Sequence, residues 1–172
     1  MELQDAVRTR RTHKVYGADP VDPAVLEELF DLARWAPNHH LTNPWRFRVV
    51  GPQALERLKA VEDDPVAAKK LDRAPTLVAV SSASGDDASA ADRQEDLMAS
   101  ACAAYVVLLA ATERGLASYW RTPGVLTRPE GRTALGIGDD EQIVGLLHLG
   151  SMRQEPQTPE RAPLDAVCTF LD

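Results

Sequence analysis

A long run of apolar residues in the second half of the chain constrains the fold more than any other feature. Residues 92–114 have the pattern of one helix, acidic at its start, basic at its end and followed by Gly115, which favours a helix end. Within it, residues 97–111 are apolar on nearly every face, which is typical of a helix covered on all sides. In a chain of only 172 residues, we expect a second subunit to supply part of that cover.

The size and charge of the chain narrow its class. Residues 1–172 fit a single domain with a substantial core. A net charge of -7 and a pI near 5.1 argue against nucleic acid or an anionic membrane as the main partner. The run 97–111 is shorter than the roughly 20 residues of a membrane-spanning helix, and no apolar signal-peptide core precedes it. Cys102 and Cys168 lack the spacing of a disulfide scaffold, so we expect a soluble, cytoplasmic protein.

Helices and strands are predicted to alternate along the chain. Helices are expected over 2–10, 23–36, 54–71 with a break near 63–65, 92–114 and 128–135, and strands over 45–50, 77–81, 117–120, 143–149 and 166–171. The small polar residues 82–89 predict a loop, and the proline-containing residues 151–162 predict an extended arm. This order indicates the α+β class. A last strand reached through an arm, without a helix, could pair with the sheet of another subunit.

Two polar clusters resemble the two sides of a flavin mononucleotide (FMN) site. Residues 10–14 place two guanidinium groups, a hydroxyl and an ammonium within five positions, the donor set that a phosphate needs. Residues 36–47 form a loop in which two prolines prevent helix continuation and polar side chains suit a ring edge or a ribityl chain. Taken singly, the first cluster is more often a solvated basic helix end and a loop histidine more often structural. Their order and spacing favour the site.

A third motif completes a family resemblance. Residues 115–124 follow the apolar helix and place an aromatic ring, a guanidinium and a hydroxyl beside a glycine-rich turn. Together with residues 10–14, 36–47, 73–75, 95–103, 143–150 and 161–164, this motif resembles the FMN-dependent nitroreductase family, most closely its compact single-domain members. The resemblance implies an α+β sandwich with a mixed or antiparallel central sheet flanked by helices. It also implies an obligate homodimer, with a long central helix and two FMN molecules at the interface.

The same resemblance implies which residues contact the cofactor. From one subunit they would be Arg10, Arg11, Thr12 and Lys14 at the phosphate and ribityl chain, with Trp120, Arg121 and Thr122 along the isoalloxazine or its ribityl side, and from the partner Trp35 and His39. Thr12 keeps the hydroxyl of the usual serine, and Lys14 keeps the charge, but not the fork, of an arginine. Trp35 replaces a polar or basic residue, and a core tryptophan is its alternative interpretation. For Arg121 the alternative is a surface ion pair.

We therefore expect an enzyme in which the flavin carries the chemistry and no side chain is a nucleophile. FMN would accept hydride from NADPH or NADH and then reduce a nitroaromatic, quinone or similar electron-poor small molecule in a ping-pong cycle, with Arg121 stabilising the reduced ring. Two alternatives stay open: a protein that binds or sequesters FMN with little turnover, and a specialised flavin reductive enzyme of the same fold. Whether residues 82–92 gate the site also stays open. No metal site is expected, because the histidines lack ligand-spaced cysteines and adjacent His39 and His40 would point apart.

Overall fold

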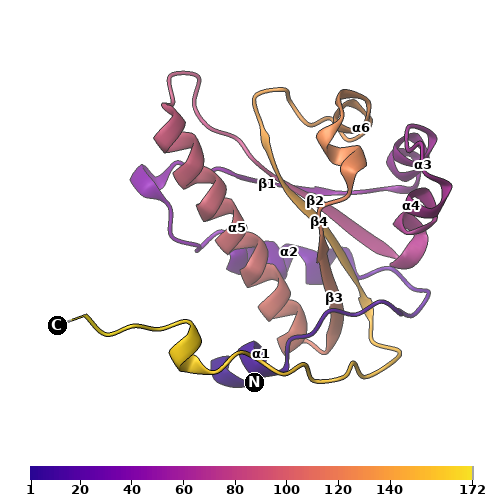
Figure 1. Cartoon of the computed structure of the whole chain (residues 1–172). Coiled ribbons are helices and arrows are strands. Elements are labelled where there is room, and N and C mark those ends of the chain that lie inside the picture. The colour runs from indigo at the N-terminus through magenta and orange to yellow at the C-terminus, as the bar shows by residue number, and fades with distance from the viewer. Residues whose placement is uncertain (172) are drawn as a thin grey trace.

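A computed structural model describes residues 1–171 (Figure 1). Its helices are α1 (Leu3–Thr9), α2 (Pro23–Ala33), α3 (Pro52–Ala60), α4 (Pro65–Lys69), α5 (Ala90–Glu113) and α6 (Pro129–Ala134), and its strands are β1 (Trp45–Val49), β2 (Thr76–Ser82), β3 (Leu116–Arg121) and β4 (Gln142–Ser151). Short 3-10 turns lie at His39–Leu41, Leu71–Arg73, Gly124–Thr127 and Leu164–Ala166. Helices and one sheet intermix, which confirms the expected α+β class.

The four strands form one antiparallel sheet in the order β1-β2-β4-β3. β2 is interior and buried along its whole length, as its continuous apolar sequence predicts. The register of β2 and β4 shifts between Val80 and Ser81, opposite Gly145, whose φ is 153°. This bulge bends β4 where it passes Trp120 of β3.

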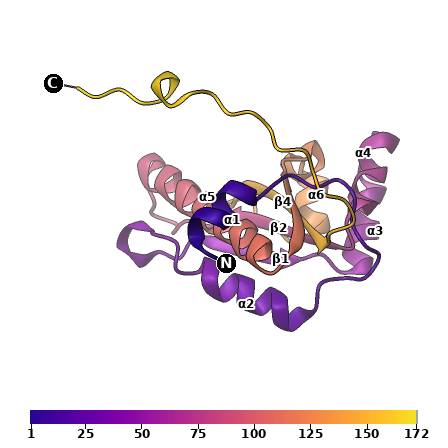
Figure 2. The same ribbon diagram turned by 90° about the horizontal axis from the view of Figure 1, so that it is seen from below.

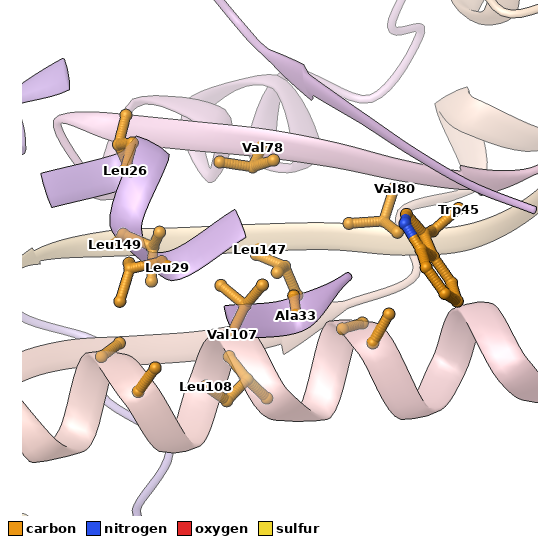
Figure 3. Packing of buried hydrophobic residues seen from close by; sticks show 14 of the residues in the cluster. Leu26, Leu29, Ala33, Trp45, Val78, Val80, Val107, Leu108, Leu147 and Leu149 are labelled. Carbon is orange, nitrogen blue, oxygen red and sulfur yellow. The ribbon is translucent and has the colours of Figure 1, made fainter. Parts of the chain in front are cut away.

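Helices cover both faces of the sheet. On one face α2 and α5 enclose a core in which Leu29, Val107 and Leu147 are fully buried (Figure 3). On the other face α3, α6 and the turns beside them enclose a second core around Leu58 and Leu146. Asp22 caps α2 by accepting from the Ala24 N–H at 2.8 Å, and Pro23 occupies the first helical turn, as the sequence predicts.

α5 is the central helix of the molecule. It begins at a capping box in which Ser89 and Asp92 satisfy each other's backbone N–H groups, and it contacts α2 and all four strands. By length and composition it could cross a membrane, but 50% of its most apolar window is buried, as in the core helix of a globular protein. Its apolar character is not matched by burial on every side, because Met98, Cys102 and Tyr105 are exposed.

The C-terminal segment corrects one expectation. The pattern of residues 166–171 predicts a strand, but the structure has a single 3-10 turn at Leu164–Ala166 and no strand in the described residues beyond it. The C-terminal arm, residues 152–171, runs away from the rest of the chain (Figure 2), and Phe170 is 91% exposed. A strand needs a neighbour for its backbone hydrogen bonds, and within one chain the arm lies beside none. The strand prediction is therefore wrong for the isolated chain.

Candidate functional site

The basic cluster of residues 10–14 lies beside β3. Thr12 forms a parallel bridge with Ser118, and the His13 N–H donates to the Ser118 carbonyl at 3.0 Å. Beyond Thr12 the chain leaves β3 and reaches the end of β4, where Tyr16 bridges Met152 and the Gly17 N–H donates to the Ser151 carbonyl at 3.0 Å. The fold thus brings together the first and third motifs, which are far apart in the sequence.

Alternate residues of this extended segment face opposite sides. Thr12 and Lys14 are exposed, and within residues 1–171 no ion pair involves Arg10 or Lys14. Arg11 is placed differently. Its guanidinium donates to the Arg8 and Arg10 carbonyls and to Thr158 Oγ1 at 3.4 Å, beside the C-terminal arm. The positive groups at positions 10 and 14 therefore have no competing partner in the part of the chain that the structure describes, whereas the Arg11 guanidinium is already bonded.

Trp120 and Arg121 lie on opposite faces of the sheet, as neighbours in a strand must. Trp120 packs against the α5 side, and its Nε1–H donates to the Val144 carbonyl at 3.0 Å. Arg121 faces the other side, where its guanidinium donates to the Lys70 carbonyl at 3.4 Å. Thr122 follows the strand and is exposed. Within the described chain Arg121 forms no ion pair, so the alternative interpretation of Arg121 is wrong.

The sequence analysis missed a polar group next to Arg121. His148 of β4 is opposite Tyr119 of β3, with ring centroids 5.7 Å apart. Its side chain is fully buried, and neither ring nitrogen has a hydrogen-bond partner among residues 1–171. Burial, helped by the positive charges of Arg121 and Arg73, lowers the pKa of His148 to about 3. A histidine inside the apolar run 143–149 was the signal in the sequence, but only the fold places it beside two arginines.

This side of the sheet carries several positively charged residues. Within residues 1–171, no ion pair involves Lys70, Arg73 or Arg121. Nearby, burial raises the pKa of Tyr16, whose hydroxyl donates to the His13 carbonyl at 2.8 Å. Unpaired cations beside buried neutral groups suit a ligand that is anionic or becomes so.

The loop that carries the second cluster has a strained backbone. His40, Leu41 and Asn43 have φ values of 51°, 54° and 47°, in the left-handed region that non-glycine residues rarely adopt. The turn at His40 also brings its ring beside that of His39, with centroids 4.0 Å apart and the ring planes tilted by 44°, so the expectation that these two rings point apart is wrong. Within residues 1–171 no group of three or more His, Cys, Asp or Glu side chains is arranged to hold a metal ion.

His39 and Trp35 lie away from the N-terminal cluster. Figure 1 shows the loop near the start of α5 and residues 10–14 near its end, and His39 Nδ1 lies 2.8 Å from Glu95 Oε2 in the first half of α5. Trp35 is 77% exposed, so its interpretation as a core residue is wrong. Within residues 1–171 no hydrogen bond, ion pair or aromatic pair joins either side chain to residues 10–14 or 120–122. One chain alone does not assemble the predicted set.

The loop also borders two hollows. One, of about 490 Å³, lies between His39, His40 and residues 85–88 of the loop that joins β2 to α5. The other is shallower, and its lining includes His39, Glu95, Met98 and Cys102. His39 is therefore at the margin of the α5 face, the exposed surface formed by Met98, Cys102 and Tyr105.

Known proteins resemble this chain over almost its whole length. The protein-family model described as "Nitroreductase family" matches residues 7–63 and 54–151 of this chain. The Bacillus subtilis protein named "Putative NAD(P)H nitroreductase YfhC" is 25% identical over 178 residues, which cover 94% of this chain and 90% of that protein. A nitroreductase-like family protein from Bacillus cereus has a TM-score of 0.88 at 24% identity, with 99% and 96% of the two chains covered. The FMN and NADPH-dependent nitroreductase NfnB from sphigopyxis sp. strain HMH has a TM-score of 0.80 at 19% identity, with 100% of each chain covered.

Proposed function

Because this chain belongs to the nitroreductase family, we propose that it is an FMN-dependent oxidoreductase, with NADPH or NADH as donor and a nitroaromatic, quinone or similar flat electron-poor molecule as acceptor. The observation that carries the proposal is the set of unpaired donors beside β3. Among residues 1–171, the side chains of Arg10, Thr12 and Lys14 form no hydrogen bond or ion pair that a phosphate would have to displace. NfnB, whose fold is similar, is FMN and NADPH-dependent. We expect the cytoplasm as its location, since both cysteines are free thiols.

The residues present fit the chemistry of FMN. Arg10, Thr12 and Lys14 would hold the phosphate and ribityl chain through charge-assisted hydrogen bonds. Arg11 would join them by exchanging its bonds to backbone carbonyls for a phosphate oxygen. When bound, FMN supplies a ring that accepts hydride and later gives up two electrons.

The remaining residues would surround the ring. Arg121 would stabilise negative charge on the reduced ring, supported by the neighbouring charge of Arg73. Trp120 would act mainly through packing, because its N–H is already bonded to Val144, and exposed Thr122 would reach the ring or the ribityl chain. Buried His148 stays neutral and adds no charge of its own.

A second copy of the chain would complete the site. The α5 face and the C-terminal arm both expose apolar side chains, with Met98 54% and Leu164 73% exposed. A homodimer that buries them would remove this apolar surface from water. It would also bring His39 and Trp35 to the flavin of the partner subunit, which the geometry of one chain does not allow. Residues 1–172 would then act as one domain whose site needs two copies.

Anaerobic reduction tests the proposal directly. The purified protein, loaded with FMN, is mixed with NADPH or NADH without oxygen while the visible flavin band is followed. Rapid bleaching, reversed by a nitroaromatic or a quinone, is the expected result. A bound flavin that stays oxidised would favour sequestration, and product analysis would separate a specialised reductive enzyme from a nitroreductase. Failure to retain any flavin would contradict the site.

A further inference from the structure

Two adjacent acidic residues of α5 hold the two ends of the strained loop. His39 Nδ1 lies 2.8 Å from Glu95 Oε2, and the Thr42 hydroxyl donates to Asp96 Oδ1 at 2.6 Å. Asp96 is only 4% exposed, whereas the side chains of His39 and Glu95 are 57% and 46% exposed. The buried contact anchors the loop, and the exposed contact orients a ring at its surface.

The strain makes these contacts more than incidental. Left-handed backbone is unfavourable for residues other than glycine, so His40, Leu41 and Asn43 keep this shape only because other contacts hold it. Inside the loop, Asn38 Oδ1 accepts from the Asn43 N–H at 2.9 Å. A loop held in this way presents its side chains in one arrangement, which reduces the entropy lost when a ligand binds.

The pairing also selects which atom of His39 is available. Nδ1 is occupied by the Glu95 carboxylate, so Nε2 on the far side of the ring is the nitrogen left for another partner. A carboxylate that fixes one ring nitrogen and thereby orients the other is a common arrangement at binding sites. His39 lies beside Met98 and Cys102 of the α5 face, where a second copy would cover it.

We propose that Glu95 is a positioning residue, which holds His39 so that Nε2 contacts the flavin bound mainly by the partner subunit. This inference rests on the proposed function, in which His39 reaches that flavin. With Nδ1–H donated to Glu95, a neutral ring presents Nε2 as an acceptor, which suits a ribityl hydroxyl or an imide N–H rather than the phosphate. Among residues 1–171, the Glu95 carboxylate forms an ion pair with His39 alone.

Amide substitutions separate the two ring nitrogens. In His39→Asn the amide nitrogen takes the place of Nδ1 and can still donate to Glu95, and in His39→Gln the amide oxygen takes the place of Nε2 and can still accept. The FMN dissociation constant is measured by flavin fluorescence quenching for these variants, Glu95→Ala, His39→Ala and the double alanine variant. Gln94→Ala is the matched control, since Gln94 is exposed on the same helix and its side chain has no hydrogen bond among the described residues. Light scattering reports whether each variant keeps the oligomeric state of the wild type.

The expected pattern is specific. His39→Ala and Glu95→Ala each raise the FMN dissociation constant about fivefold, the size of one net hydrogen bond, and the double variant raises it little further. His39→Asn resembles His39→Ala although it can still pair with Glu95, His39→Gln binds closer to the wild type, and Gln94→Ala binds as the wild type does.

Other outcomes would overturn the inference, and they differ from failure of the proposed function. If the pair only shaped the loop, His39→Asn would bind FMN normally and His39→Gln would not. Additive effects of the two alanine substitutions would show that Glu95 does not act through His39. A wild type that binds FMN, with variants that bind it equally well, would overturn this inference alone. A wild type that binds no FMN would overturn the proposed function as well.

Discussion

Trp120 and Gly145 lie so close across β3 and β4 that no larger residue fits at position 145. A Cβ built on Gly145 would overlap the indole Nε1 and come within 2.6 Å of the Arg121 carbonyl oxygen. The φ of 153° at Gly145 is also one that other residues rarely adopt. The glycine therefore sets the position of the two β3 residues that we assign to the flavin.

Substitution of this glycine should damage both the fold and the site. We expect Gly145→Ala to lower the free energy of unfolding by about 2–4 kcal/mol, from backbone strain and overpacking, and to weaken FMN binding. Thermal melting and the tryptophan emission spectrum measure the change. Gly85→Ala is the control, because a Cβ at Gly85 meets nothing within 4 Å. Equal melting temperatures for the two variants would contradict the prediction.

Glu141 should make the protein sensitive to acid. Burial raises the pKa of Glu141, but the hydrogen bonds from Arg48, Ser81 and the Gly138 N–H outweigh burial and hold the pKa below its usual value. The stabilisation is thus present above the unfolded pKa of about 4.3 and is lost as the pH falls through the lower folded value. We expect Glu141→Gln to lower the free energy of unfolding by about 2–3 kcal/mol at pH 7 and by much less near pH 2. Urea titrations at both pH values measure this, with exposed Glu27→Gln as the control.

His148 should destabilise the protein in mild acid. Its folded pKa of about 3 lies below the unfolded value of about 6.5, so between these values the unfolded chain binds a proton that the folded protein does not. Stability should therefore fall as the pH decreases from about 6.5. His148→Leu removes this proton-binding site. As the pH falls from 7 to 4.5, we expect the free energy of unfolding of the variant to rise by about 2 kcal/mol relative to that of the wild type. If the free energies of unfolding of the two proteins changed in parallel with pH, the His148 ring would have a hydrogen-bond partner in solution that keeps its pKa near the ordinary value.

Arg10 should recognise the phosphate of FMN rather than its ring. We expect Arg10→Ala to raise the FMN dissociation constant at least about tenfold, because a hydrogen bond to a charged group is lost, and to leave riboflavin binding nearly unchanged. Fluorescence titration with both ligands makes the comparison. Arg8→Ala removes an exposed positive charge from the last turn of α1 and should leave both affinities unaltered.

Mixed dimers test whether each site uses two chains. A heterodimer of one Arg10→Ala and one His39→Ala subunit, isolated with two affinity tags, would have one site with both lesions and one with neither. We expect it to bind one FMN with wild-type affinity and a second one weakly. Two moderately weakened sites would mean that Arg10 and His39 serve the same site from one chain. Tyr105→Glu, which places a charge on the α5 face, should favour monomers in light scattering, whereas Val66→Glu on α4 should not.

Local signals in the sequence were enough to predict most elements. Asp22 and Pro23 mark the start of α2 because capping and proline geometry act within a few residues. The continuous apolar run at β2 predicts a strand inside a sheet, because such a strand is covered on both faces. The pattern failed at residues 166–171, where strand formation depends on a neighbour that one chain does not supply.

The sequence by itself determined the α+β class, the family and the donor groups of the site, because caps, periodicity and short motifs depend on chemistry within a few residues. Only the tertiary structure decided which of those groups are available. It left Arg10 and Lys14 without ion-pair partners in the described chain, bonded Arg11 to nearby carbonyls and Trp120 to Val144, and exposed Trp35. It also paired His39 with Glu95 and buried His148 near two arginines. These relations join residues that are distant in the chain, and they follow from how helices and strands pack rather than from any local pattern.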